Sequence, residues 1–136
     1  MSTARKFEEL DVWQRSRELA NLIYSFSKEG TFSRDFGLRD QIRRASVSIM
    51  SNIAEGFESS TQQTFIKYLG HAKASAGEVR AQLYIVKDQG YISNEEFEKA
   101  REMAEICSRQ LSRFIQYLKN QPNSRRVRED GASYDV

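Results

Sequence analysis

The stretch from Gln41 to Ser59 limits what this chain can fold into more than any other part of the sequence. At about 100° per residue on an α-helix, its apolar side chains, with Leu38 just before it, cover roughly 200° of the helix circumference. A surface helix that packs on one neighbour needs an apolar stripe of little more than about 100°. The stretch therefore predicts the inner helix of a bundle, with partners on two or three sides. The apolar positions are Leu38, Ile42, Ala45, Val47, Ile49, Met50, Ile53, Ala54 and Phe57.

Composition indicates an ordinary soluble protein. The 136 residues suffice for one domain with a hydrophobic core, and 39% hydrophobic with 29% charged residues is typical of soluble proteins. A net charge of +2 is mildly basic and well short of that of a dedicated nucleic-acid clamp. The lone cysteine, Cys107, cannot pair within the chain, which favours a reducing compartment. No membrane-spanning run and no apolar signal core are present, so we expect a cytoplasmic protein with no membrane partner.

Hydrophobic periodicity predicts four helices, at about residues 10–28, 34–58, 61–89 and 94–120. In the third, seven apolar residues from Phe65 to Val86 follow an unbroken 4-3 spacing, which is typical of a bundle seam. The links are short, so neighbouring helices should run antiparallel. The predicted fold is therefore all-α, an antiparallel up-down-up-down four-helix bundle over residues 1–120. The segment 121–136 has too few apolar residues to offset its ordering entropy and is predicted to be a disordered tail.

Glycines and serines mark the ends of these helices. Gly30 and Gly90 are suited to the left-handed conformation that follows a helix. Ser60 and Ser93 each begin a sequence that matches a capping box, so they are the predicted N-caps of the third and fourth helices. Gly56 is expected only to weaken the last turn of the second helix.

Small residues recur on the outer side of the third helix, opposite the seam. Glycine on a solvent-facing helix surface costs about 0.5–1 kcal/mol relative to alanine, so such a stripe is unusual. It is either a bare surface with no partner or a shallow groove into which another helix packs. Taken with the wide apolar arc of the second helix, it favours a subunit interface. The predicted interface residues are Met50, Phe57, Gly70, Ala74, Gly77 and Ala81.

The sequence holds no recognisable catalytic or metal-binding pattern. His71 is the only histidine and Cys107 the only cysteine, so no zinc site with ordinary ligands can form within one chain. The carboxylates of the fourth helix alternate with lysine and arginine at i, i+3 and i+4, as on a solvated, ion-paired face. No nucleophile elbow and no phosphate-binding loop are present. We therefore expect no enzyme activity, no metal and no cofactor.

A polar strip on the second helix, formed by Ser48, Asn52 and Glu55, has two interpretations. Asn52 borders the apolar arc, so hydrogen bonds of the strip could fix the register of the bundle, as a buried asparagine does in coiled coils. Alternatively, the strip could be a recognition surface. Because partly buried polar groups are usually satisfied within the protein, we favour the structural role.

Clustered positive charge is the one binding chemistry that the sequence suggests. Arg39, Arg43 and Arg44 lie near the start of the second helix, and Lys73, Arg80 and Lys87 repeat every seven residues along the third. Repeated around a symmetric oligomer, these six residues would form an extended basic surface for the phosphates of RNA or DNA. Alternatively they only solubilise the protein, because acidic residues lie beside them in the sequence.

Four segments of the chain resemble the 23S rRNA intervening-sequence proteins, a family of four-helix bundles. They are LDVWQRSRELANLIY at Leu10–Tyr24, FGLRDQIRRASVSIMSNIAEG at Phe36–Gly56, FIKYLGHAKASAGEVRAQL at Phe65–Leu83 and GYIS at Gly90–Ser93. These segments keep the family's order and spacing, and the resemblance covers about residues 7–119. The family commonly has proline at the positions of Met50 and Ser33. The second helix should therefore be less kinked here, and its start less sharply defined.

The resemblance implies oligomerisation and nucleic-acid contact, and no catalysis. Members are typically encoded within inserts in bacterial rRNA genes, and related accessory proteins of diversity-generating retroelements form pentameric rings that bind a reverse transcriptase and nucleic acid. Two hypotheses follow. The first is a homo-oligomeric accessory protein, expected to be a pentamer, whose partners are RNA or DNA and a reverse transcriptase or other protein. The second is a protein-interaction scaffold that binds no nucleic acid.

Overall fold

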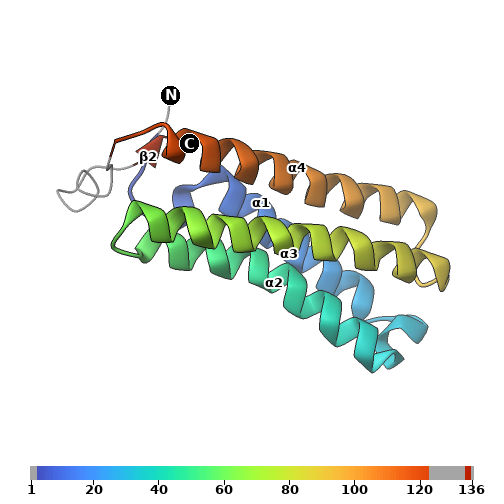
Figure 1. Ribbon diagram of the computed structural model, residues 1–136. Coiled ribbons are helices and arrows are strands. Elements are labelled where there is room, and N and C mark those ends of the chain that lie inside the picture. The colour runs from blue at the N-terminus through green and yellow to red at the C-terminus, as the bar shows by residue number, and fades with distance from the viewer. Residues whose placement is uncertain (1–2, 123–133, 136) are drawn as a thin grey trace.

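The computed structural model describes residues 3–122 and 134–135. Four long helices lie side by side, and each runs antiparallel to the next along the chain (Figure 1). They are α1 (Asp11–Ser27), α2 (Phe36–Glu58), α3 (Gln62–Asp88) and α4 (Asn94–Lys119), accompanied by the short 3-10 helices η1 (Phe7–Glu9) and η2 (Gly30–Arg34). α2 packs on α1 and α3, and α4 packs on α3 and α1, which closes a four-sided bundle. The predicted all-α bundle is confirmed, with helix bounds within two residues of those expected.

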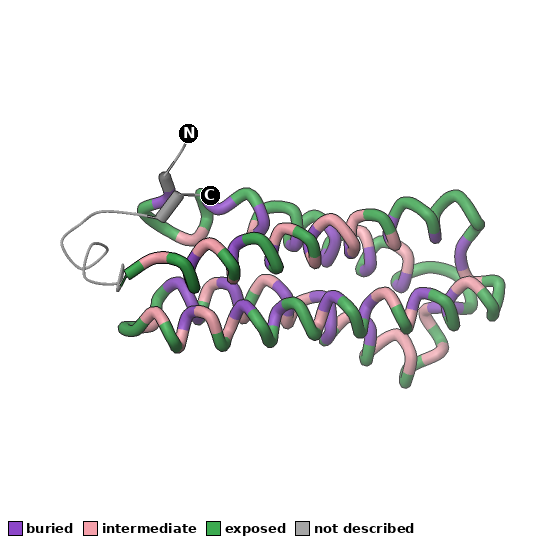
Figure 2. The backbone as a smooth tube through the Cα atoms, turned by 45° about the horizontal axis from the view of Figure 1, so that its top comes forward, coloured by how far each residue is buried: buried purple, intermediate pink, exposed green. Residues whose placement is uncertain are grey.

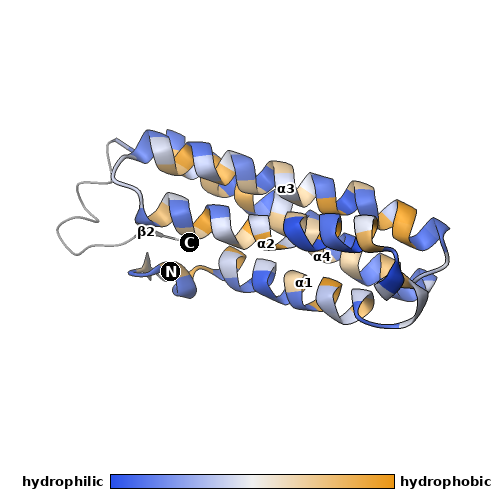
Figure 3. Ribbon diagram, turned by 90° about the horizontal axis from the view of Figure 1, so that it is seen from below, coloured by the Kyte–Doolittle hydropathy of each residue, from blue (hydrophilic) through white to orange (hydrophobic). Residues whose placement is uncertain are grey.

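The core runs between the inner faces of all four helices (Figure 2). All seven residues of the predicted α3 seam are inaccessible to solvent, because the 4-3 spacing keeps their side chains on one face. Near the start of α3, Phe65 packs edge-to-face on Phe57 of α2 and on Phe114 of α4, with ring centroids 6.0 and 5.3 Å apart. Hydrophilic and hydrophobic residues mix along each helix, as expected for amphipathic helices around one core (Figure 3).

α2 has neighbours on two sides, as its wide apolar arc predicts. Five of the nine apolar residues of the arc are buried in the bundle. The other four are only half-buried, so a single bundle leaves part of the arc uncovered. These four are Leu38, Val47, Met50 and Ala54.

Gly56 has a packing role that the sequence did not reveal. A Cβ atom at this position would lie 2.9 Å from Cδ1 of Phe65 and 2.9 Å from Cβ of Tyr68. Real Cβ atoms do not approach side chains so closely, so only glycine fits the unstrained contact. α2 and α3 therefore come close together just before the turn that joins them.

Most of the predicted helix ends are confirmed. Gly30 and Gly90 adopt positive φ angles of 59° and 76°. Ser93 forms the full capping box: its Oγ accepts from the backbone N–H of Glu96, and a Glu96 carboxylate oxygen accepts from the N–H of Ser93. The prediction that Ser60 caps α3 is wrong by one position. The N-cap is Thr61, whose Oγ1 accepts from the N–H of Thr64 at 3.1 Å, because the helix begins one residue later than expected.

The two ends of the chain meet at one end of the bundle (Figure 1). Thr3–Ala4 (β1) pairs with Tyr134–Asp135 (β2) in an antiparallel two-residue ladder, and Ala4 is fully buried. Most of the predicted disordered tail, 123–133 and 136, lies outside the described residues. Sequence patterns did not indicate the pairing, because two residues are too few to show a strand period.

Candidate nucleic-acid interface

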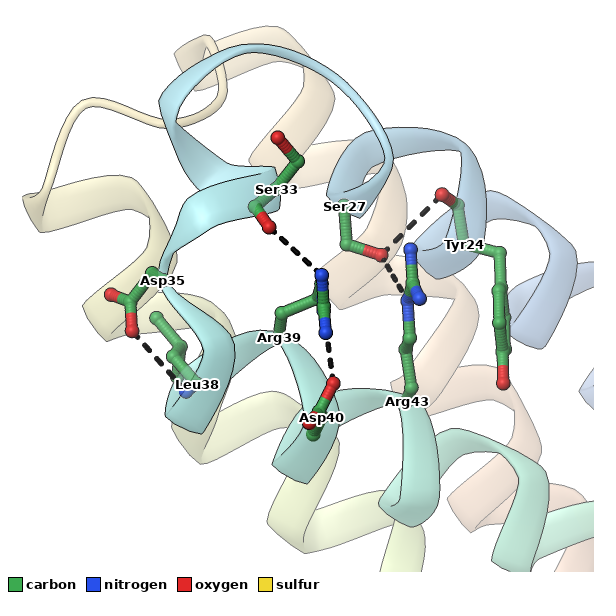
Figure 4. Close-up of polar contacts among 8 residues, drawn as sticks. All are labelled: Tyr24, Ser27, Ser33, Asp35, Leu38, Arg39, Asp40 and Arg43. Atoms are coloured by element: carbon green, nitrogen blue, oxygen red, sulfur yellow. Dashed lines mark hydrogen bonds and ion pairs between the residues drawn. The ribbon is translucent and has the colours of Figure 1, made fainter.

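Arg39, one of the six predicted phosphate-binding residues, is held within its own chain (Figure 4). Its Nε donates to Oδ1 of Asp40 at 2.9 Å, and its Nη1 donates to the backbone oxygen of Ser33 at 2.9 Å. The guanidinium carbon also lies 4.9 Å from the centre of the Phe36 ring. Arg39 therefore connects the first turn of α2 to η2.

Arg43, one turn further along α2, contacts α1 (Figure 4). Its Nε donates to Oγ of Ser27 at 2.7 Å, and its guanidinium carbon lies 4.5 Å from the centre of the Tyr24 ring. The Ser27 hydroxyl in turn donates to the backbone oxygen of Tyr24 at 3.4 Å. This side chain thus joins α1 to α2.

Arg80 and Lys87 lie on the side of α3 that faces α4. Arg80 Nη2 is 3.5 Å from Oε1 of Glu105, whose second oxygen pairs with Arg101 at 2.7 Å. Lys87 Nζ lies 4.7 Å from the centre of the Phe97 ring. Both cations therefore already have partners in the bundle.

Arg44 and Lys73 complete the predicted set. Both are exposed, and neither forms an ion pair within the described part of the chain. The structure thus does not gather the six residues into one surface. Arg39 and Arg43 contact η2 and α1, whereas Arg80 and Lys87 contact α4.

A different group of cations gathers where α3 begins and α4 ends. Residues 62–77 of α3 and 106–119 of α4 contain no aspartate or glutamate, and we call these two segments the basic half. They lie side by side, since Nε2 of Gln62 donates to the backbone oxygen of Leu118 at 2.5 Å (Figure 1). All five cations of the basic half are exposed, and none has an ion pair among the residues that the structure describes. They are Lys67, Lys73, Arg109, Arg113 and Lys119.

At the other end of the same helix pair, carboxylates outnumber cations. Residues 78–88 of α3 and 94–105 of α4, which we call the paired half, hold seven carboxylates and four cations. Arg101 bonds to Glu98 at 2.9 Å and to Glu105 at 2.7 Å, and these hydrogen bonds raise the pKa of its guanidinium. In the paired half Arg80 and Arg101 therefore have carboxylate partners, whereas the five cations of the basic half have none among the described residues. The Asp11 carboxylate, which accepts from Gln110 of the basic half, is paired with Arg15 of its own helix.

Sequence reasoning missed four cations of the basic half: Lys67, Arg109, Arg113 and Lys119. Cations that repeat every seven residues along one helix favoured Arg80 and Lys87 instead. The signal present in the sequence was the pair of acid-free runs, 62–77 and 106–119. These runs come together only because antiparallel packing places the start of α3 beside the end of α4.

The predicted subunit interface divides into exposed and buried residues. Gly70, Ala74, Gly77 and Ala81 are exposed on the outer side of α3, and Met50 of α2 is half-buried. The prediction for Phe57 is wrong, because its side chain is only 1% exposed and packs on Phe65 in the core of its own bundle. At Phe57 the apolar face of α2 is covered by α3, so this side chain has no free surface for a second subunit.

Two of the three residues of the predicted polar strip bond to each other within α2, and one of them also bonds to α3. Asn52 Nδ2 donates to the backbone oxygen of Ser48 at 2.8 Å and to its Oγ at 2.9 Å. Ser75 of α3 donates to the same Oγ at 3.0 Å. Glu55 is exposed and lies outside this network. Ser48 thus links α2 to α3, and Asn52 supports Ser48 from within α2.

Other features of the bundle that bear on function are its metal-ligating side chains, the Cys107 thiol, the apolar character of its helices and a surface cavity. Residues 3–122 and 134–135 include no group of three or more His, Cys, Asp or Glu side chains that could hold a metal ion. Cys107 is buried, and this burial raises the pKa of its thiol to about 11, which keeps it protonated at neutral pH. None of the described helices has the length and apolar character needed to span a bilayer. A surface cavity of about 580 Å³ lies between the end of α1 and the start of α4, lined by residues that include Phe26, Ile92 and Lys99.

Comparison with known proteins places the chain in a family. Residues 8–113 match the model of the 23S rRNA-intervening sequence protein family. The fold is similar to the crystal structure of a protein with unknown function from the S23 ribosomal protein family of Bacteroides thetaiotaomicron, with a TM-score of 0.70. The two chains are 27% identical, and the match covers 76% of this chain and 97% of the other. No curated protein matches the chain. Because the family model spans most of its length, the chain belongs to the 23S rRNA-intervening sequence protein family.

Proposed function

We propose that this protein is a non-enzymatic, oligomeric accessory protein that binds the phosphate backbone of RNA or DNA through its basic half. The observation that carries the proposal is a pair of adjoining helix segments with five exposed cations and no carboxylate of their own. Like charges without counter-charges repel one another, so this arrangement does not stabilise the bundle. Phosphate groups would supply the missing negative charge, and their condensed counterions would be released.

The chemistry of the basic half favours binding without sequence preference. Lysine and arginine side chains on helix surfaces reach phosphate oxygens, which carry no base identity. Gly70 lies between Lys67 and Lys73 in the α3 sequence, and a Cβ atom at this position would meet nothing within 4 Å. The sugar–phosphate backbone of a nucleic acid could therefore approach α3 closely at Gly70.

Oligomerisation is the second part of the proposal. The stripe Gly70, Ala74, Gly77 and Ala81 is exposed, and the α2 arc is only partly covered by one bundle. A second copy that packed on either surface would bury apolar area and offset the glycine cost. A closed ring, for which we expect five copies, would repeat the basic half and multiply a modest charge.

Two matched double variants test the nucleic-acid proposal. Arg109→Gln with Arg113→Gln removes two positive charges from the basic half, and Arg80→Gln with Lys87→Gln removes two from the paired half. Fluorescence anisotropy of a labelled single-stranded RNA at several salt concentrations measures affinity. The basic-half variant should weaken binding to all sequences and reduce the log–log salt slope by about 1.4, since each phosphate contact contributes about 0.7. The paired-half variant should keep the wild-type slope, because its cations already have partners.

Light scattering on the same samples reports the oligomer mass and shows whether either variant has lost its assembly. Equal losses of affinity in the two variants would mean that net charge alone matters and that the basic half is not the site. If the wild type binds neither single- nor double-stranded RNA or DNA at about 50 mM salt, where screening is weak, the proposal fails. The protein would then be a protein-interaction scaffold whose cations only solubilise it.

A further inference from the structure

We propose that the end of α1 and the start of α2 form a separate surface that stacks the unpaired bases of single-stranded RNA or DNA. This inference deepens the proposed function and rests on it for the class of ligand. The surface consists of two aromatic rings and the two guanidinium groups in contact with them, and we call it the aromatic–arginine cluster. Its members are Tyr24, Phe36, Arg39 and Arg43.

Phe36 is the most unusual member of this cluster. Its side chain is 63% exposed, more than any other large hydrophobic residue that the structure describes. It begins α2, where any residue could take the first helical position, so the bundle does not require an aromatic ring there. Tyr24 is also exposed, at 39%. The two exposed rings, each in contact with a guanidinium group, together form a surface suited to a planar partner outside the chain.

The two arginines of the cluster are held in fixed positions. Arg39 is bonded on one side to Asp40 and on the other to the backbone of Ser33 (Figure 4). Its guanidinium lies against the Phe36 ring. Arg43 is bonded through Nε to Ser27 and lies against Tyr24. A side chain that is already ordered loses little conformational entropy when a ligand binds. The cluster is therefore pre-organised for planar ligands.

The free groups of the cluster suit a nucleotide. The exposed Phe36 ring offers a π-face on which a base can stack, and the Arg39 guanidinium beside it adds a cation–π contribution. Among the described residues, Arg43 uses only Nε in hydrogen bonds, so both of its Nη groups can donate to a phosphate. Bases in a duplex are already stacked and paired, so this surface should select single strands.

The charge around the cluster favours a nucleic acid over a protein partner. Residues 28–44 carry five cations and three carboxylates, and two of the three carboxylates already accept hydrogen bonds within the chain. Asp40 pairs with Arg39, and Asp35 accepts from the Tyr91 hydroxyl at 2.9 Å and from the backbone N–H of Leu38. The five cations are Lys28, Arg34, Arg39, Arg43 and Arg44.

Variants of Phe36 test the inference with two probes, a labelled oligouridylate and an RNA duplex of the same length. Phe36→Leu removes the π-face and keeps an apolar side chain at an exposed position, so the bundle should fold normally. It should weaken oligouridylate binding by at least about fivefold, the effect of losing one stacked base, and leave duplex binding unchanged. Tyr84→Leu is the matched control, because Tyr84 is also aromatic and 52% exposed but lies on α3. It should change neither affinity.

Phe36→Trp provides a direct readout of stacking. This variant should bind oligouridylate at least as tightly as the wild type, and its added indole fluorescence, measured above that of Trp13, should be quenched by the probe. The inference is overturned if Phe36→Leu leaves oligouridylate binding unchanged or weakens both probes equally. It is also overturned if that variant loses oligomer mass, because Phe36 would then be a subunit contact. A wild type that binds the duplex while Phe36→Leu changes nothing rejects this inference alone, whereas a wild type that binds neither probe rejects the proposed function with it.

Discussion

Small side chains lie on both the inner and the outer face of α3, but only those on the inner face are packed. On the inner face Ala72 and Ala76 are fully buried, and α2 comes so close that Gly56 leaves no room for a Cβ atom. On the outer face Gly70 and Gly77 are exposed, and a Cβ atom at either would meet nothing within 4 Å. The same residue types thus allow close packing on one face and face open space on the other.

The role of a small residue therefore depends on its neighbour. Glycine within a helix costs about 0.5–1 kcal/mol relative to alanine. At Gly56 the close approach of α2 and α3 accounts for that cost. At Gly77 no contact within the described chain does so, which is why the outer face supports the proposal of a second copy.

The largest expected change in fold stability comes from adding a side chain at Gly56, where α2 and α3 are in close contact. Gly56→Ala places a methyl group 2.9 Å from both the Phe65 ring and Cβ of Tyr68, so α2 and α3 must move apart near their shared turn. Overpacking of this kind costs about 1–3 kcal/mol, and the gain in helix propensity of up to about 1 kcal/mol only partly offsets it. Urea unfolding followed by circular dichroism should therefore give a lower free energy of unfolding than for the wild type.

Gly77→Ala is the control for this substitution on the outer face. It makes the same chemical change where space is open, so it should raise the free energy of unfolding by about 0.5–1 kcal/mol. The contrast between the two faces would be refuted if Gly56→Ala proved as stable as Gly77→Ala.

The core of the bundle could be predicted because it depends on local periodicity. The α3 seam and the α4 positions from Phe97 to Leu118 follow from spacing alone, and all of them are buried. The left-handed glycines and the Ser93 cap depend on at most four consecutive residues, so they also followed from the sequence. These features need no knowledge of which helix lies beside which.

The candidate sites could not be predicted in the same way, because they depend on contacts between distant residues. Arg43 is bonded to Ser27, sixteen residues away, and this bond ties a predicted phosphate ligand to α1. Gly56 and Phe57 gain their roles from Phe65 on the next helix. The basic half joins two segments from different helices. A helical wheel shows which face is apolar, but it does not show which partner covers that face.

A charged side chain on the outer face should change assembly and leave the fold nearly intact. Gly77→Glu places a long carboxylate in the small-residue stripe, where it has room within one bundle but would clash with a second helix packed there. Circular dichroism should show wild-type helicity, while light scattering should show a mass near that of one 15.8 kDa chain. A wild type that is already monomeric, or a variant that keeps the full assembly, would show that the outer stripe is not a subunit interface.

The smallest expected effects compare the two halves of the surface that α3 and α4 share. Arg101→Gln removes both ion pairs of Arg101, with Glu98 and Glu105, and should lower the melting temperature slightly. Arg113→Gln should raise it slightly, because Arg109 and Arg113 stand at i, i+4, and like charges at that spacing destabilise a helix by about 0.2–0.5 kcal/mol.

Salt separates this electrostatic explanation from a change in packing. Attraction in the paired half and repulsion in the basic half are both screened by added salt, so both shifts in melting temperature should shrink toward zero. Circular dichroism melts at low and high salt measure the two shifts with opposite signs. If Arg113→Gln also lowered the melting temperature at low salt, Arg113 would have a stabilising partner. The basic half would then be part of the fold's own charge balance, and the case for a phosphate partner on it would lose its main support.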